Sequence, residues 1–275
     1  MSKLFKITFF FWLIINFSNI AIGNALGSNI ANIAFVFAIS YLFLKKDVLS
    51  VNRFIDRETY GFMFILIIIS MLVFLILKDG MILVNEAILL IISFFILVFL
   101  YKKFFYQDSK NYKKTSSEDL QSNASVFTNL VFGLLTLLVG TELLLNSSVI
   151  AAKHYGISNY VIGLSITAIG SSIPELASSI ESARKKNIDF IIGNILGSNI
   201  FNFTIVISLA GLFSFELPKP LYFTDLLRDI IMILITMVSF YIIIKNHNYL
   251  LSKILCTLLL GLFTMYQISL YGISL

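Results

Sequence analysis

Long apolar runs separated by short polar stretches extend along the whole chain. Several, such as residues 62–77 and 81–100, approach or reach the roughly 20 residues that cross a bilayer as a helix. Lipid admits only helices and closed barrels, and these runs are too long for barrel strands. The pattern predicts an all-α, polytopic membrane helix bundle with about nine segments, at residues 7–22, 30–44, 60–77, 81–101, 126–152, 158–181, 188–215, 221–244 and 249–272.

Composition agrees with this pattern, because 58% of the 275 residues are hydrophobic and only 13% are charged. In soluble domains, about a quarter of the residues are charged. Most basic residues fall in alternate loops, which is typical of the cytoplasmic side. This basic set comprises Lys45, Lys46, Arg53, Arg57, Lys102, Lys103, Lys110, Lys113, Lys114, Arg184, Lys185, Lys186, Lys245 and Lys253.

These loops predict a multi-pass protein of the cell (inner or plasma) membrane. The N-terminus and the central linker are expected in the cytoplasm, and the C-terminus outside. No aromatic-interleaved basic patch or nucleic-acid motif accompanies the positive charge. The expected partners are therefore the lipid bilayer and inorganic cations, not nucleic acid.

The first 25 residues admit two interpretations. Lys3 and Lys6 precede a short apolar core and then small residues, as in a signal peptide. However, cleavage near Ala25 would cut through a motif that recurs later in the chain, which favours a membrane segment. A polar, Ser/Lys-rich stretch at residues 105–125 then divides the chain. We expect a first, incomplete membrane repeat at 1–104, a linker at 105–125 and a second repeat at 126–275.

An internal repeat relates the two parts. Residues 22–32 read IGNALGSNIAN and residues 192–202 read IGNILGSNIFN, so nine of eleven positions are identical. The loop charges give the two copies opposite orientations, which is typical of transporters with an inverted repeat and a substrate site near the bilayer midplane. The Gly-x-x-x-Gly spacing alone would be explained by helix packing. Packing does not require Asn24, Ser28, Asn29 and Asn32 to recur, as they do, at Asn194, Ser198, Asn199 and Asn202.

Candidate chemistry gathers around Glu175, a carboxylate inside an apolar segment and therefore a functional hypothesis by default. Ser198 and Asn202 lie four residues apart on one helix face, and Ser28 and Asn32 repeat that arrangement. Pro174 lacks an N–H, so we expect the carbonyls near Ala168 and Ser171 to become available as ligands. An oxygen-only ligand set suits hard cations and disfavours zinc or copper.

Other reactive residue types do not form a site. Cys256 lies in an apolar run, and His154 and His247 lie in short loops without a metal-binding partner. No metalloprotease, nucleophile-elbow or phosphate-loop motif is present, so the sequence gives no case for an enzyme.

At GSSIPEL (residues 170–176) and GNILGSNIFN (193–202), with GNALGSNIAN (23–32), the chain resembles the calcium/cation antiporter superfamily, most closely sodium/calcium exchanger-type proteins. The resemblance implies ten helices in two inverted halves, and transport of Ca²⁺ against Na⁺ or H⁺ without a bound cofactor. It also implies a set of cation ligands, namely Glu175, Ser171, Ser172, Ser198, Asn202, Ser28, Asn32 and the Ala168 carbonyl.

The chain departs from that pattern in its first half. Glu175 precedes Ser198 by 23 residues, but the same step back from Ser28 reaches Phe5, and residues 1–17 contain neither Pro nor Glu. The chain therefore resembles an N-terminally truncated exchanger with one of two expected glutamates, and its activity is expected to be impaired. The alternatives are a monovalent cation or proton exchanger, and a non-transporting scaffold or degenerate partner subunit.

Overall fold

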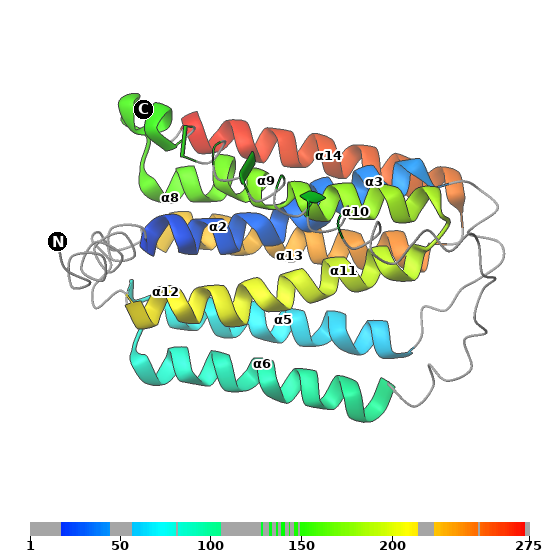
Figure 1. Cartoon of the computed structure of the whole chain (residues 1–275), viewed down its shortest axis with the longest axis horizontal. Coiled ribbons are helices and arrows are strands. Elements are labelled where there is room, and N and C mark those ends of the chain that lie inside the picture. The colour runs from blue at the N-terminus through cyan, green and yellow to red at the C-terminus, as the bar shows by residue number, and fades with distance from the viewer. Residues whose placement is uncertain are drawn as a thin grey trace.

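The computed structural model describes residues 18–44, 57–80, 82–105, 151–213, 223–246 and 248–272, with scattered residues between 128 and 150. The described residues form helices and no strand, which confirms the predicted all-α bundle (Figure 1). Six of the helices are long and apolar enough to cross a membrane, and Val84–Leu100 forms a shorter apolar helix.

The helices run roughly side by side along the long axis of the molecule (Figure 1). The first half contains α2 (Ser18–Ala31), η1 (Asn32–Phe37), α3 (Ala38–Phe43), α5 (Arg57–Leu77) and α6 (Val84–Phe105). The second half contains α8 (Asn159–Ile162), η3 (Gly163–Thr167), α9 (Ala168–Ser171), α10 (Ile173–Arg184), α11 (Ile188–Phe201), η4 (Asn202–Val206), α12 (Ile207–Phe213), α13 (Phe223–Lys245) and α14 (Tyr249–Gly272).

One predicted boundary is wrong. The sequence predicts two segments, 7–22 and 30–44, with a break between them, but from Ser18 onward α2, η1 and α3 form one continuous helix, of which Asn19–Phe43 is long and apolar enough to cross a membrane. The polar motif between the two predicted segments lowers the local hydropathy and so resembles a loop. In the structure Ser28, Asn29 and Asn32 are buried inside the bundle, where other helices supply their hydrogen bonds.

Several predictions concern residues outside the described part of the chain. These are the signal-peptide alternative and the side on which the N-terminus lies, most of the 105–125 linker, and His247. The predicted segment 126–152 is described only in part, and its described residues are helical. Cys256 is buried in α14, within its apolar run, whereas His154 is exposed but helical and does not lie in the predicted loop, which starts at the next residue.

The two copies of the repeated motif run in opposite directions. In Figure 1 the blue helix α2 leaves the end near the N label, whereas the yellow-green helix α11 starts at the opposite end and continues into α12 toward it. This antiparallel arrangement is the inverted orientation that the loop charges predicted. It places the two polar motifs side by side, with the buried Asn32 of one motif against the buried Asn199 of the other.

Candidate cation site

Both copies of the motif end in the same unusual backbone feature. The π-helices η1 and η4 begin at Asn32 and Asn202, which are equivalent residues of the repeat. A third π-helix, η3, precedes the serines of the GSSIPEL stretch. Single π-turns inside α-helices occur often at functional sites because they displace side chains from regular helical register. The backbone thus departs from α-helical geometry where the sequence places its candidate ligands.

Four asparagine amides join the two halves by a reciprocal pattern of hydrogen bonds. Asn32 Nδ2 donates to Asn199 Oδ1 at 2.9 Å, and Asn202 Nδ2 donates to Asn29 Oδ1 at 3.5 Å. Each bond links the last asparagine of one motif to the inner asparagine of the other. Asn32 and Asn202 therefore meet the opposite repeat without bonding to each other. The pattern is the two-fold relation expected where inverted repeats meet.

A second polar contact joins α2 to α9. The hydroxyl oxygens of Ser28 and Ser171 are 3.0 Å apart, and the Ser171 hydroxyl also lies 2.9 Å from Asn24 Oδ1. The predicted free carbonyl at Ala168 is already engaged, because it accepts from the Ser172 N–H at 3.2 Å and lies 3.2 Å from the Ser171 hydroxyl. The expected opening of the helix upstream of Pro174 takes another form: Ser172 is a turn between α9 and α10.

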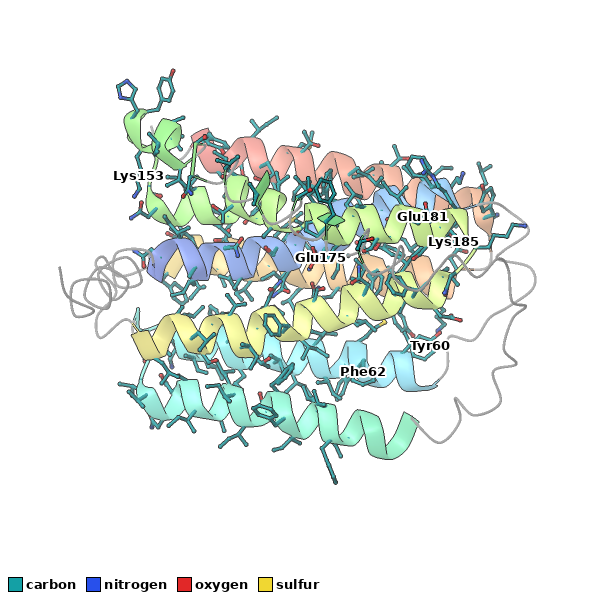
Figure 2. The ribbon with its side chains drawn as sticks, in the orientation of Figure 1. Tyr60, Phe62, Lys153, Glu175, Glu181 and Lys185 are labelled. Carbon is teal, nitrogen blue, oxygen red and sulfur yellow. The ribbon has the colours of Figure 1, made fainter. Side chains whose placement is uncertain are left out.

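Glu175 lies in the first turn of α10, directly after this turn. The hydroxyl of Ser198, on α11, donates a hydrogen bond to Glu175 Oε1 at a distance of 3.5 Å. The side-chain amide of Asn194 lies within hydrogen-bond distance of Ser178, Ser179 and the Glu175 carbonyl, which holds α10 and α11 together. Figure 2 shows Glu175 near the middle of the bundle, between Lys153 at one end and Lys185 at the other. The carboxylate is therefore remote from both ends of the bundle.

Several oxygens of the site have no partner among the described residues. These buried acceptors are Glu175 Oε2, Ser172 Oγ and Asn32 Oδ1. Buried polar atoms are rarely left unpaired, and such atoms indicate water or an ion at the site. Carboxylate, hydroxyl and amide oxygens suit a hard cation. No group of three or more His, Cys, Asp or Glu side chains occurs in the described residues, so that part of the chain offers no ligand set for a transition metal.

The sequence matches the family model for sodium/calcium exchanger proteins over residues 7–102 and 125–272, which together make up most of the chain. The chain belongs to the sodium/calcium exchanger family. Because this is a family of transporters, membership confirms a multi-pass membrane protein that is not an enzyme.

The chain aligns with different fractions of the lengths of its relatives in the exchanger family. It is 36% identical to CaxA of Alkalimonas amylolytica, described as a proposed antiporter, over 69% of this chain and 59% of the relative. It is 38% identical to the sodium/calcium exchanger MaX1 of Methanosarcina acetivorans over 44% of this chain and 34% of that protein. A solved structure of the sodium-calcium exchanger NCX_Mj superposes with a TM-score of 0.63 at 25% identity, covering 92% of this chain and 77% of that one. The chain thus spans less than two thirds of these two sequence relatives.

The two copies of the family motif pack differently in this chain. A Cβ on Gly23 would lie 2.4 Å from the Tyr160 carbonyl oxygen, and one on Gly27 would lie 2.5 Å from the Leu164 carbonyl oxygen. The equivalent Gly193 and Gly197 have no heavy atom of the described residues within 4 Å of such a Cβ. Close helix packing therefore explains the Gly-x-x-x-Gly spacing of the first copy. Among the described residues it does not explain the spacing of the second copy.

Sequence reasoning did not include the asparagines Asn24, Asn29, Asn194 and Asn199 in the site, although their recurrence in the motif was a sufficient signal. It also missed a buried network on α13. Asp229 is fully buried and accepts from Arg228 Nε at 2.7 Å, Tyr160 OH at 2.7 Å and Tyr266 OH at 2.9 Å. The signal was available as Asp225, Arg228 and Asp229 at helical spacing inside a predicted membrane segment.

Proposed function

We propose that the chain acts as a secondary-active cation antiporter of the sodium/calcium exchanger type, with the transported cation bound at Glu175. The observation that carries the proposal is the convergence of the two inverted motifs in the interior next to a carboxylate. The ligands would be oxygens of Glu175, Ser171, Ser172, Ser198 and Asn202 from the second half, with Ser28 and Asn32 from the first.

Glu175 supplies the negative charge that both ions of an antiporter would share. Oε1 is held by Ser198 and Oε2 is unpartnered among the described residues, so a cation can approach without breaking a described bond to Oε2. Two cations that compete for one carboxylate cannot bind together, and this competition couples their movements in opposite directions. The turn at Ser172 and the π-helices η1 and η4 are the backbone positions at which we expect the site to adjust.

The charge of the site bears on which ions are carried. Glu175 is the one carboxylate that a described hydrogen bond joins to the candidate ligands. A unit charge pair 4 Å apart contributes about 4 kcal/mol at an effective dielectric constant of about 20, and a divalent cation about twice that for each carboxylate. Amides of Asn32 and Asn202 are neutral and do not replace a second carboxylate. This favours a monovalent cation or proton as one transported ion, with Ca²⁺ held weakly by this chain alone.

Transport by the purified full chain in liposomes tests the proposal. We expect a Na⁺ gradient to drive uptake of radioactive Ca²⁺, or radioactive Na⁺ to exchange against unlabelled cation. Glu175→Gln should reduce either flux to the level of empty liposomes. Glu181→Gln is the matched control, because Glu181 lies on the same helix, is about half exposed and pairs with Lys185 at the end of the bundle. No flux of either ion above that of empty liposomes would support the non-transporting alternative instead, whereas equal, measurable flux from wild type and Glu175→Gln would show that the cation does not bind at Glu175.

A further inference from the structure

A groove of about 340 Å³ lies on the side of the bundle, between α5 and α13, and outside the candidate cation site. Its floor is formed by buried side chains, among them Ile33, Leu66 and Phe240, and its rim by the exposed Phe64 and Val238. The volume falls in the range of about 300–1,000 Å³ that is typical of small-molecule sites. Every lining side chain is apolar or aromatic. The groove therefore suits a hydrocarbon chain.

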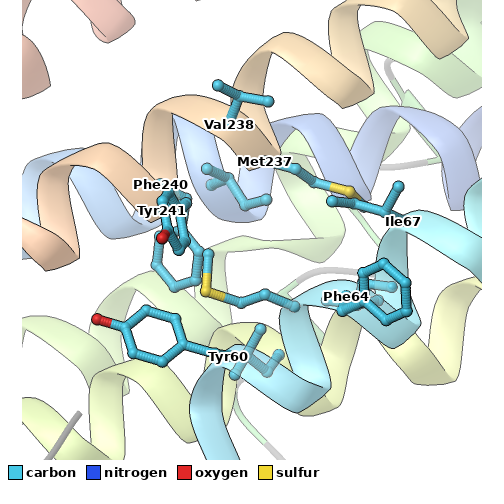
Figure 3. Close-up of a pocket in the computed structure, with 11 residues that line it drawn as sticks. Tyr60, Phe64, Ile67, Met237, Val238, Phe240 and Tyr241 are labelled. Carbon is cyan, nitrogen blue, oxygen red and sulfur yellow. The ribbon is translucent and has the colours of Figure 1, made fainter. Parts of the chain in front are cut away.

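One end of the groove carries the polar groups. Figure 3 shows the hydroxyl oxygens of Tyr60 and Tyr241 at the same end, with Phe64 and Ile67 toward the other. The two tyrosine rings pack edge to face with centroids 5.4 Å apart. Lys245 Nζ donates to Tyr241 OH at 3.3 Å and lies 5.5 Å from that ring. Tyrosines and basic residues of this kind are enriched where helices meet the membrane surface.

The lysine at this end has no counter-ion in the described part of the chain, where no carboxylate lies within ion-pair distance of it. Lys245 is exposed and belongs to the last turn of α13. Tyr60 lies toward the same end of the bundle as Lys185 (Figure 2), which directly follows Arg184 in the last turn of α10. The groove thus has an apolar floor and ends at two hydroxyls, one of them bonded to a lysine that has no counter-ion among the described residues. These features match the acyl chain and the charged headgroup of a phospholipid.

We propose that this groove binds an anionic phospholipid, with one acyl chain along the apolar floor and the phosphate at Lys245 and the Tyr60 and Tyr241 hydroxyls. The charge of Lys245 selects the anionic headgroup, and the two hydroxyls act as donors to phosphate oxygens. The flexible side chains of Met63 and Met237 line the groove and let it adapt to chains of different length. The proposal requires no transport by the chain and therefore stands or fails separately from the antiporter function.

A lipid bound in the groove would affect the cation site. Ile33 in the floor follows Asn32, whose amide donates to Asn199, and Leu196 in the same floor lies on α11 between Asn194 and Ser198. An acyl chain against these two side chains would press on η1 and α11, the elements that present the ligands. The lipid would thus stabilise the packing of the two repeats from outside.

Native mass spectrometry of the purified full chain tests the proposal, with phosphatidylglycerol and phosphatidylcholine of identical acyl chains as the probes. Wild type should retain phosphatidylglycerol preferentially. Lys245→Gln should weaken that retention about fivefold, which is the contribution of one lysine beside an anionic lipid. Lys253→Gln is the matched control, since Lys253 also lies over a tyrosine ring, 4.7 Å from the centroid of Tyr249, but Tyr249, unlike Tyr241, does not line the groove.

A second variant tests the acyl half of the site. Val238→Trp fills the exposed rim and should reduce retention of both lipids, whereas Lys245→Gln should affect only the anionic one. A phosphatidylglycerol with a photoreactive acyl chain should label peptides containing Met63 or Met237. Equal retention of the two lipids by wild type, equal effects of the two lysine substitutions, labelling elsewhere in the chain, or complete displacement by soluble glycerol phosphate would each overturn the proposal.

Discussion

The same substitution in the two copies of the repeated motif is expected to have opposite effects. Alanine at position 23 would place a Cβ 2.4 Å from the Tyr160 carbonyl oxygen and 3.1 Å from Gly163 Cα. Ordinary carbon contacts lie at about 3.5–4.0 Å, so α2 and α8 would have to separate by roughly 1 Å. Overpacking of this kind costs about 1–3 kcal/mol. Alanine at position 193 meets no described atom within 4 Å and gains up to about 1 kcal/mol of helix propensity.

Because both alanines lie in helices and gain the same propensity, the difference between the two variants is the overpacking cost of about 1–3 kcal/mol in the free energy of unfolding, or on the order of 5 °C in melting temperature. Cys256 is the chain's single cysteine and is buried, so a thiol-reactive dye reports unfolding in detergent without further engineering. Gly61→Ala on α5 is the control for a glycine with open surroundings. Equal melting temperatures for Gly23→Ala and Gly193→Ala would refute the inference that, among the described residues, the first copy makes the close helix contact and the second does not.

Two further predictions concern buried polar contacts and use the same dye assay. A double-mutant cycle of Asn32→Leu and Asn199→Leu should give a coupling of about 0.6–1.7 kcal/mol, the range for hydrogen bonds between membrane helices, and additive effects would contradict the reciprocal amide pattern. Asp229→Leu should destabilise the chain by about 3–5 kcal/mol, because it removes the fully buried carboxylate that Arg228 and two tyrosine hydroxyls share and leaves Arg228 with Asp225 alone, whereas Asp225→Asn, at a half-buried partner, should cost no more than about 1 kcal/mol. Similar losses for the two aspartate variants would show that burial does not set the strength of these ion pairs.

The fold class and the symmetry could be predicted from the sequence because they depend on local properties. The length of each apolar run indicates whether it can cross the hydrocarbon core of a bilayer. The recurrence of IGNxLGSNIxN at a constant offset of 170 residues indicates a duplication. The predicted helix boundaries were wrong where a polar stretch of sequence lay inside a helix. The motif at residues 22–32 has the composition of a loop but lies within a continuous helix, because side chains from the other half satisfy its polar groups.

The sequence by itself determined that the chain is a helical membrane protein with an inverted repeat and that Glu175 is a carboxylate inside one of its apolar segments. Only the tertiary structure decided which amides pair across the halves and which glycines are in close contact. It alone also showed that Asp229 is buried against Arg228 and two tyrosines, and that a groove ends at Tyr60 and Tyr241, the second of which is bonded to Lys245. Hydropathy and periodicity are properties of neighbouring residues, whereas these contacts join residues far apart in the chain. They depend on how the helices pack.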